Sequence, residues 1–276
     1  IDNAVILVQG NRIAAIGPAA SVSIPDGYKR VDASGKTIVP GFIDAHWHGN
    51  MGEDGIVPQQ SWVNMASLAF GVTTLHDPSN RNDHIFTQAE LQRSGQVLGP
   101  RIFSTGSVLY GAKGGSTAIV NSLEDALTHL KRQQANGAIS VKSYNQPRRE
   151  QRQMLLEAAR QTGMMVVPEG GSMFQQNMSF IVDGHTGLEH ALPIAEVYDD
   201  VTQLWSQTRV GYTPTLNVAY GGLDGEHYWY ARTDVWRHPL LSRYVPAGLL
   251  QARAVRRPTA PEEDFNVLRV ARTATA

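Results

Sequence analysis

The sequence predicts an α/β fold in which a small N-terminal β unit, residues 1–36, precedes an incomplete TIM-barrel-like (β/α)8 domain, residues 37–276. Short apolar runs alternate with stretches whose apolar residues recur every three or four positions, which is the pattern of strand followed by helix. Repeated strand and helix units form parallel sheets. Seven such strands are found, one fewer than a closed barrel needs, so we expect truncation before strand eight.

The N-terminal β unit begins with two apolar stretches, residues 4–8 and 13–17, on either side of a tight turn at residues 9–12. This arrangement predicts a hairpin. A third strand is expected at residues 28–32, and the Ser34-Gly35 turn then leads into the barrel. The first residue is Ile1, within an apparent strand, so we expect the sequence to be a piece of a longer polypeptide.

The barrel elements follow from the same patterns. Strands are expected at residues 37–48, 72–75, 101–104, 139–142, 164–167, 187–190 and 212–216. Helices are expected at residues 62–70, 123–134, 150–161 and 195–206. An aromatic, glycine-rich loop at residues 220–230 then either shapes a substrate pocket or packs on the surface. The acidic residues 262–264 are expected to begin a final helix, because carboxylates favour helix N-termini.

Composition excludes several classes of protein. With 24 basic and 25 acidic residues the net charge is −1, which argues against nucleic-acid binding. The chain has no cysteine, so disulfides and thiolate metal sites are excluded. Because no stretch approaches 18 apolar residues and no charged-then-apolar leader opens the chain, neither a membrane span nor a signal peptide is expected. The 42% hydrophobic content suits a globular protein with a sizeable core.

The first barrel strand ends in His46-Trp47-His48. On a strand, His46 and His48 share one face while Trp47 points to the other. Imidazole is a common ligand of divalent zinc, copper, iron and nickel, although a His-x-His pair alone also occurs on solvated strands. An apolar run precedes this pair, and barrel active sites lie at the carboxyl ends of strands. We therefore expect a metal site here.

Further candidates follow other strands. Lys142 ends the fourth strand and His190 the sixth, so both open onto the face of the histidine pair. A lysine buried among metal ligands can lose its proton and react with carbon dioxide, giving an anionic ligand that bridges two metals. His185 fits a turn whose side chain could reach the rim of the pocket. For His76, at the end of the second strand, we expect a structural hydrogen bond.

The motifs at residues 33–48, Gly71-Val72-Thr73-Thr74 and Leu188-Glu189-His190 resemble the metal-dependent amidohydrolase superfamily. Within it the chain looks like the imidazolonepropionase and prolidase-like branch. It is most similar to bacterial members whose barrel follows an N-terminal β-propeller repeat region. The phrases at residues 167–171, 183–187 and 225–230 favour that subgroup.

The resemblance implies a barrel with a small β-sandwich built from both ends of the region, and a site for one or two divalent ions, zinc above all. It implies hydrolysis of carbon–nitrogen bonds (amide, cyclic amide or peptide) in a small-molecule or peptide substrate, through metal-activated water. His46 and His48 match the first-strand ligands, Lys142 the carboxylated lysine and His190 the sixth-strand ligand. A propeller region in the parent protein and a periplasmic or secreted location are also implied, and a homo-oligomer stays open.

Two departures from the family pattern stand out. Where the fifth strand should end in histidine, this chain has Glu169, which either supplies a carboxylate ligand or marks a site that has lost part of its metal shell. The eighth strand, with the aspartate that acts as general base, is missing, so Glu169, His185 and His227 are candidate catalytic substitutes. The alternative hypothesis is a decayed or truncated barrel that binds a peptide or glycan. Its contact residues would be Trp229, Tyr230 and Trp236.

Overall fold

The computed structural model describes residues 1–112, 118–170, 173–216, 227–255 and 267–275 of the chain. It divides into two compact units, Ile1–Pro40 and Gly41–Ala276. This division falls four residues after the domain boundary expected from the sequence. Each unit is described by itself.

The first unit contains the predicted hairpin. Strand β1 (Ala4–Gln9) pairs antiparallel with β2 (Arg12–Pro18), and the register shifts between Leu7 and Val8. The strand expected at residues 28–32 does not form, so that prediction is wrong. Its central apolar residue, Val31, is 81% exposed and has no sheet face to pack against. A two-stranded ribbon is therefore the whole described sheet of this unit, and the β-sandwich stays a prediction.

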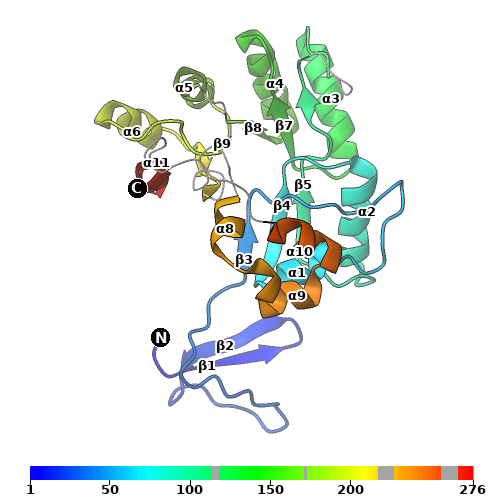
Figure 1. Ribbon diagram of the computed structural model, residues 1–276, viewed down its shortest axis with the longest axis vertical. Helices are drawn as coiled ribbons and strands as arrows, with labels where there is room; N and C mark the ends of the chain where they lie inside the picture. Colours follow the sequence, from blue (N-terminus) through cyan, green and yellow to red (C-terminus); the bar gives the residue numbers. More distant parts are fainter. Residues whose placement is uncertain (113–117, 171–172, 217–226, 256–266, 276) are drawn as a thin grey trace. The chain divides into compact units, whose positions relative to one another are not determined.

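The second unit is built from parallel strands (Figure 1). Strands β3 (Phe42–Asp44), β4 (Val72–Asp77) and β5 (Arg101–Ser104) form one sheet in that order. Strands β6 (Leu109–Tyr110), β7 (Ser140–Tyr144) and β8 (Met165–Pro168) form a second, and β9 (Gly187–Glu189) pairs with β10 (Gly211–Thr213). The amide of Thr186 donates to the carbonyl of Val166, which ties β9 to β8. These parallel sheets in chain order fit a truncated barrel, as predicted.

Helices connect the strands. They are α1 (Trp62–Ala69), α2 (Asn82–Arg93), α3 (Leu123–Ala135), α4 (Arg149–Thr162), α5 (Phe174–Asp183) and α6 (Asp199–Ser206). Figure 1 shows α3 and α4 side by side, in green, beyond the end of β7. Helix α3 begins with a capping box between Ser122 and Asp125, and α4 ends at Gly163, whose φ of 69° is left-handed.

Two of these helices, α2 and α5, were not predicted. In α2 the buried face includes His84 and Gln88 beside Ile85, so the apolar periodicity is interrupted. The Gln88 side chain is satisfied within the protein, because its amide donates to the carbonyl of Pro58 and its oxygen accepts from Asn64. Internal hydrogen bonding therefore allows polar residues to occupy a face that sequence patterns treat as solvent-exposed.

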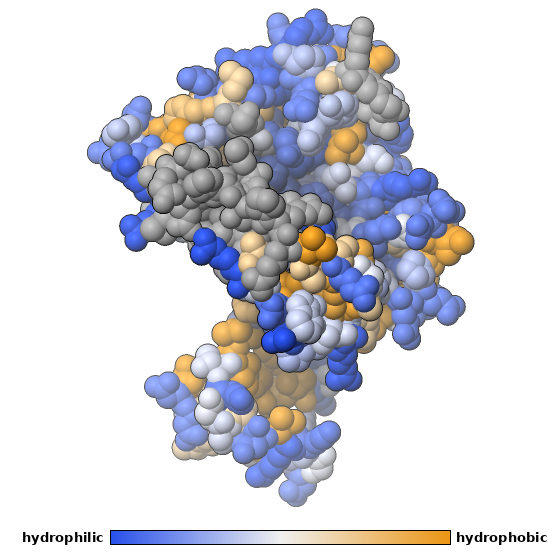
Figure 2. All heavy atoms as spheres, in the orientation of Figure 1, coloured by the Kyte–Doolittle hydropathy of each residue, from blue (hydrophilic) through white to orange (hydrophobic). Residues whose placement is uncertain are grey.

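The C-terminal part of the described chain is helical. It comprises α8 (His227–Arg232), η2 (Val235–Arg237), α9 (Pro239–Tyr244), α10 (Ala247–Ala254) and α11 (Val267–Thr275). The acidic start expected at residues 262–264 lies outside the described residues. Figure 2 shows an apolar patch over α10, where Leu249 is 45% exposed. Among the described helices, none has the length and apolar character needed to cross a membrane.

Three apolar clusters form the core of the second unit. The first gathers around Val141 and Leu155, the second around Leu75 and Trp47, and the third around Phe180 with Leu188. Burial of such side chains stabilises the fold by about 25 cal/mol for each Å² of apolar surface. Because each cluster packs against strands, the carboxyl ends of those strands are held in fixed positions.

Candidate metal centre

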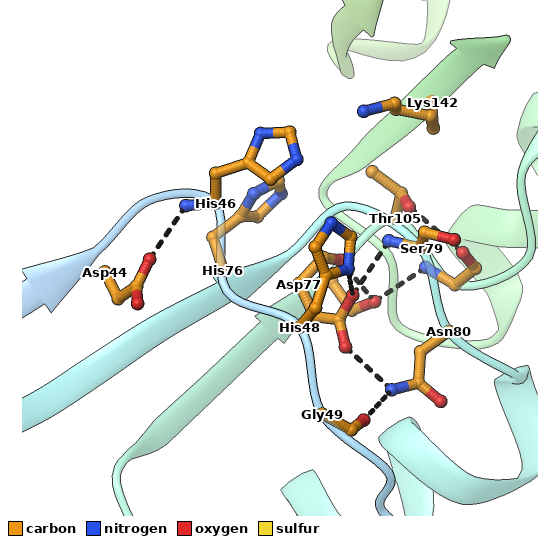
Figure 3. Close-up of polar contacts among 12 residues, drawn as sticks. Asp44, His46, His48, Gly49, His76, Asp77, Ser79, Asn80, Thr105 and Lys142 are labelled. Carbon is orange, nitrogen blue, oxygen red and sulfur yellow. Dashed lines mark hydrogen bonds and ion pairs between the residues drawn. The ribbon is translucent and has the colours of Figure 1, made fainter. Parts of the chain in front are cut away.

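The histidine pair lies in a loop and not on a strand (Figure 3). Strand β3 ends at Asp44, whose carboxylate accepts a hydrogen bond of 3.1 Å from the amide of His46 and so turns the chain out of the ladder. The predicted strand of residues 37–48 is thus too long. The two imidazoles still lie together, with ring centroids 5.0 Å apart and planes at 72°.

Contacts from the end of β4 hold this loop in place. The amide of Trp47 donates to the carbonyl of His76 over 3.0 Å, and the side-chain amide of Asn80 donates to the carbonyl of Gly49 over 2.9 Å. The Trp47 ring is buried in the second apolar cluster, so it does turn away from the histidines. The loop is therefore fixed on both sides of His48.

His76 makes structural hydrogen bonds, as the sequence predicts. Its Nδ1 atom lies 3.2 Å from the carbonyl of Ala45 and its Nε2 atom 2.7 Å from the Oγ of Ser140. Because a carbonyl only accepts, Nδ1 carries the proton and Nε2 accepts from the serine hydroxyl. Burial lowers the pKa of His76, although the carbonyl of Ala45 and the charge of Glu189 oppose this. His76 is thus a neutral bridge between β4 and β7.

Lys142, Glu169 and His190 form one linked group. The Nζ atom of Lys142 lies 2.6 Å from Oε2 of Glu169, and Nε2 of His190 lies 2.9 Å from Oε1 of the same carboxylate. The lysine side chain is only 1% exposed. Burial by itself would raise the pKa of Glu169, but the hydrogen bond from His190 and the adjacent Lys142 charge outweigh it and lower this pKa to about 2. The carboxylate is therefore ionised at neutral pH.

His46 joins this group through Glu189 and His190. Its Nδ1 atom contacts Oε2 of Glu189, and its ring centroid lies 4.8 Å from that of His190. Neighbouring residues of an extended strand point to opposite faces. His190 has a left-handed φ of 69°, so the chain turns at this position and presents both side chains to His46.

A second buried carboxylate lies beside His48. Oδ1 of Asp77 is 3.6 Å from Nδ1 of His48, and the Asp77 side chain is completely buried while that of His48 is 55% exposed. Oδ1 of Asp77 accepts from the amide of Ser79 over 2.8 Å and Oδ2 from the side chain of Asn80 over 2.7 Å. Asp77 is thus a fixed negative charge at the base of the pair (Figure 3).

The five predicted metal ligands form a continuous set of neighbours in the structure: His48, His46, His190, Glu169 and Lys142. His46 and His48 follow β3, Glu169 follows β8 and His190 follows β9, whereas Lys142 lies in the middle of β7, because the strand expected to end at residue 142 continues to Tyr144. In Figure 3 the Nζ end of Lys142 points from β7 toward the ring of His46. Their roles as ligands stay predictions.

Of the other two candidate catalytic residues, the structure describes the side chain of His185 alone, which lies apart from this set. His185 precedes the amino end of β9, is 2% exposed and contacts the ring of Phe180. Burial lowers its pKa to about 4, against the opposing effect of its hydrogen bond with the Phe180 carbonyl. His227 is the first residue of α8, and its side chain lies outside the described part of the structure.

Sequence analysis did not identify Glu189 or Asp77 as part of the site. Each directly neighbours a histidine in sequence, at His190 and His76, which is the one signal that could have drawn attention to them. A carboxylate beside a histidine in sequence is common, however. The contact of Glu189 with His46 spans 143 positions and depends on tertiary structure.

The donor atoms of this set suit a divalent ion by their chemistry, although they are not arranged around one point. In the described part of the chain, no three histidine, aspartate or glutamate side chains stand in an arrangement that could hold a metal. The candidate ligands are instead paired with one another. Two buried ring nitrogens, Nε2 of His46 and Nδ1 of His190, nevertheless have no hydrogen-bond partner. Imidazole and carboxylate donors suit zinc, so the residues fit the ion by donor chemistry.

No family model matches the chain. Two curated relatives match short stretches of sequence. Adenine deaminase 3 of Rhizobium meliloti is 37% identical over 75 residues, which make up 27% of this chain and 12% of the deaminase. An imidazolonepropionase of Streptomyces avermitilis is 40% identical over 48 residues, or 17% of this chain and 11% of that enzyme. The matched stretches therefore span about one eighth of each relative's length.

Solved structures extend the likeness to most of the chain. A protein of Bifidobacterium longum described as a prolidase has a TM-score of 0.61 at 23% identity, over 76% of this chain and 55% of that protein. At this identity the likeness concerns the fold, which confirms the predicted α/β barrel type. The relatives found by sequence and by structure are members of the amidohydrolase superfamily, so the predicted resemblance to that superfamily is confirmed. A propeller region stays a prediction.

Proposed function

We propose that this chain forms much of the catalytic region of a metal-dependent amidohydrolase that hydrolyses carbon–nitrogen bonds. The main support is the meeting of three imidazoles and a carboxylate, which follow the carboxyl ends of parallel strands, with a lysine from within β7. Barrel enzymes have their active sites at these strand ends. The relatives named above include a deaminase and an imidazolonepropionase. We propose an amide, cyclic amide or peptide as the substrate bond.

His46, His48, His190 and Glu169 would hold the ion, which we propose to be zinc. When bound, such an ion polarises a carbonyl and lowers the pKa of water toward 7. Glu169 takes the place of the histidine that the family has at the end of the fifth strand. Its pKa of about 2 makes it a weak base at neutral pH, so we assign it as a ligand and not as the general base.

Lys142 balances the charge of this set. As an ammonium at 2.6 Å from Glu169 it neutralises the carboxylate and fixes its orientation toward His190. Reaction with carbon dioxide would instead make Lys142 an anion, and Glu169 would then need another cation beside it. The number of ions bound therefore depends on the state of Lys142, and we propose one or two.

Zinc titration of the purified chain tests this function. After chelator treatment and dialysis, the protein is titrated with Zn²⁺ in a calorimeter, and roughly one or two ions per chain are expected. His46→Ala and His48→Ala should lose this binding. The matched control is His129→Ala, on helix α3 outside the set, which should keep it. Absence of zinc binding, together with unchanged thermal stability in chelator, would contradict the proposal.

The alternative function is a peptide- or glycan-binding module. It is supported by Trp236, which is 46% exposed and lines a cavity of about 410 Å³ with Leu250 and Ser242. A binding module should be indifferent to His46→Ala, while Trp236→Ala should abolish retention on peptide or glycan arrays. The propeller region and the periplasmic or secreted location implied by the resemblance also belong to our proposal, and the sequence of the full gene tests them.

A further inference from the structure

We propose that Glu189 and Asp77 are positioning residues that fix the tautomer of the histidine pair. Each would hold the proton on Nδ1 and so leave Nε2 as the electron-pair donor. This inference rests on the proposed metal-dependent function, because an ion is what Nε2 would receive. It adds two residues that do not themselves touch the ion.

The contact between Glu189 and His46 supports the first half. A carboxylate accepts hydrogen bonds, so the Nδ1 atom that contacts Oε2 of Glu189 must donate, and in the neutral ring Nε2 is then unprotonated. Both side chains are about 5% exposed, so water does not compete for this bond. Carboxylate partners of this kind orient metal-binding histidines and raise their basicity.

The opposite nitrogen of the His46 ring supplies a second observation, independent of the contact with Glu189. Its Nε2 atom is buried and has no hydrogen-bond partner in the described part of the protein. A buried acceptor left unpaired is costly to stability, so such atoms usually have a partner or a function. The Nδ1 atom of His46 contacts a carboxylate, and its Nε2 atom has no hydrogen-bond partner. Metal-binding histidines have this arrangement, in which Nε2 is the donor to the ion.

Asp77 lies on the Nδ1 side of His48, at a greater distance than Glu189 from His46 and beside a ring that is 55% exposed. Its carboxylate faces Nδ1 at 3.6 Å, longer than a hydrogen bond, while Ser79 and Asn80 hold both of its oxygens. Asn80 also holds the carbonyl of Gly49, the residue after His48. The negative charge is therefore fixed relative to the loop, and it favours a proton on the nearer ring nitrogen.

Nitrogen NMR of metal-free protein labelled with ¹⁵N-histidine tests the inference directly. At pH 8, long-range ¹⁵N–¹H correlations should show His46 and His48 as Nδ1–H tautomers. Glu189→Leu should shift His46 toward the Nε2–H form, whereas Glu189→Gln, whose amide oxygen still accepts, should keep it. Asp77→Ala should shift His48 in the same way. The control Glu157→Gln, on the exposed face of α4, should change neither ring.

Zinc affinity supplies the second readout. Glu189→Leu is expected to weaken binding by about 10- to 100-fold, the usual effect of losing such a partner. An Nε2–H tautomer of His46 in the wild-type protein, or an unchanged tautomer in folded Glu189→Leu, would overturn the inference even if zinc binds. If the wild type binds no zinc, the proposed metal-dependent function fails, and the tautomers of the metal-free protein still decide the positioning role.

Discussion

The Nζ atom of Lys142 lies 2.6 Å from Oε2 of Glu169, so this buried side chain has its partner at the residue that follows the neighbouring strand, β8. The family pattern has a histidine where Glu169 stands, and a neutral ring could not supply this charge. Glutamate in place of the histidine that the resemblance implies would thus alter the surroundings of Lys142 as well as the proposed ligand set. With Glu169 in place, the amine of Lys142 has a hydrogen-bonded carboxylate partner in a position that is 1% exposed.

Removing one partner of the Lys142–Glu169 pair should cost more stability than removing both. Glu169→Ala leaves a buried ammonium without a partner and is expected to cost about 3 kcal/mol in urea unfolding. Lys142→Met/Glu169→Gln removes both charges and should recover part of that loss. The surface pair of Arg160 and Glu157 on α4 is the control, and Glu157→Ala should cost less. Equal costs at Glu169 and Glu157 would show that the buried pair is not needed.

Because the backbone of His190 is left-handed, the stability of variants at this position should follow how well each residue tolerates a positive φ. Glycine and asparagine tolerate φ near 69°, while a β-branched residue does not. His190→Asn should therefore be more stable than His190→Val by about 1–2 kcal/mol. His190→Gly should also be more stable than His190→Val, because glycine adopts a positive φ without steric cost. Thermal unfolding of the three variants checks this order, and a valine variant as stable as the others would contradict the assigned backbone.

Gly170 is required by close packing between two strand ends. A Cβ atom added there would collide with the carbonyl oxygen of Glu189, which is backbone and cannot rotate away. Gly170→Ala should therefore displace Glu169 from His190, lower stability and weaken zinc binding. Gly248→Ala, in helix α10 with open space around it, is the control and should be neutral or stabilising. Isothermal titration and thermal unfolding of both variants decide the matter.

His185 should make stability depend on pH. Its pKa is about 4 in the folded protein, against an ordinary value of 6.5, so the unfolded chain binds the proton first as the pH falls. Stability is greatest above pH 6.5 and decreases down to about pH 4, by on the order of 3 kcal/mol. In His185→Leu, the free energy of unfolding in urea should no longer decrease between pH 6.5 and pH 4 through this residue. A slope that persists unchanged would assign it to other groups.

The strands were predictable because short apolar runs recur along the chain between segments of helical periodicity. Residues 101–104 form β5 as expected, and β4, β7 and β8 agree closely with prediction. Residues 28–32 failed because a strand also needs a partner edge, which one sequence window does not reveal. Helix α2 was missed because buried Gln88 is satisfied by partners far along the chain.

The same distinction applies to the site. Lys142, Glu169 and His190 could be placed together because parallel strands end at a common edge. The left-handed turn at His190 and the contact of Glu189 with His46 could not, because each depends on how β9 meets the loop after β3. Sequence therefore indicated which residues follow the strands, and the structure determined which atoms face each other.

The loop that carries His46 and His48 is bonded to the end of β4 through Trp47, Gly49 and Ala45, in addition to its hydrogen bond with Asp44 at the end of β3. These hydrogen bonds hold the histidines from the β4 side of β3, so their position does not depend on contacts at the opposite edge of β3. Fraying at that edge would leave His46 and His48 supported from the neighbouring strand. The position of the histidine pair should consequently be a local property, while a complete metal site would still need Glu169 and His190 from β8 and β9.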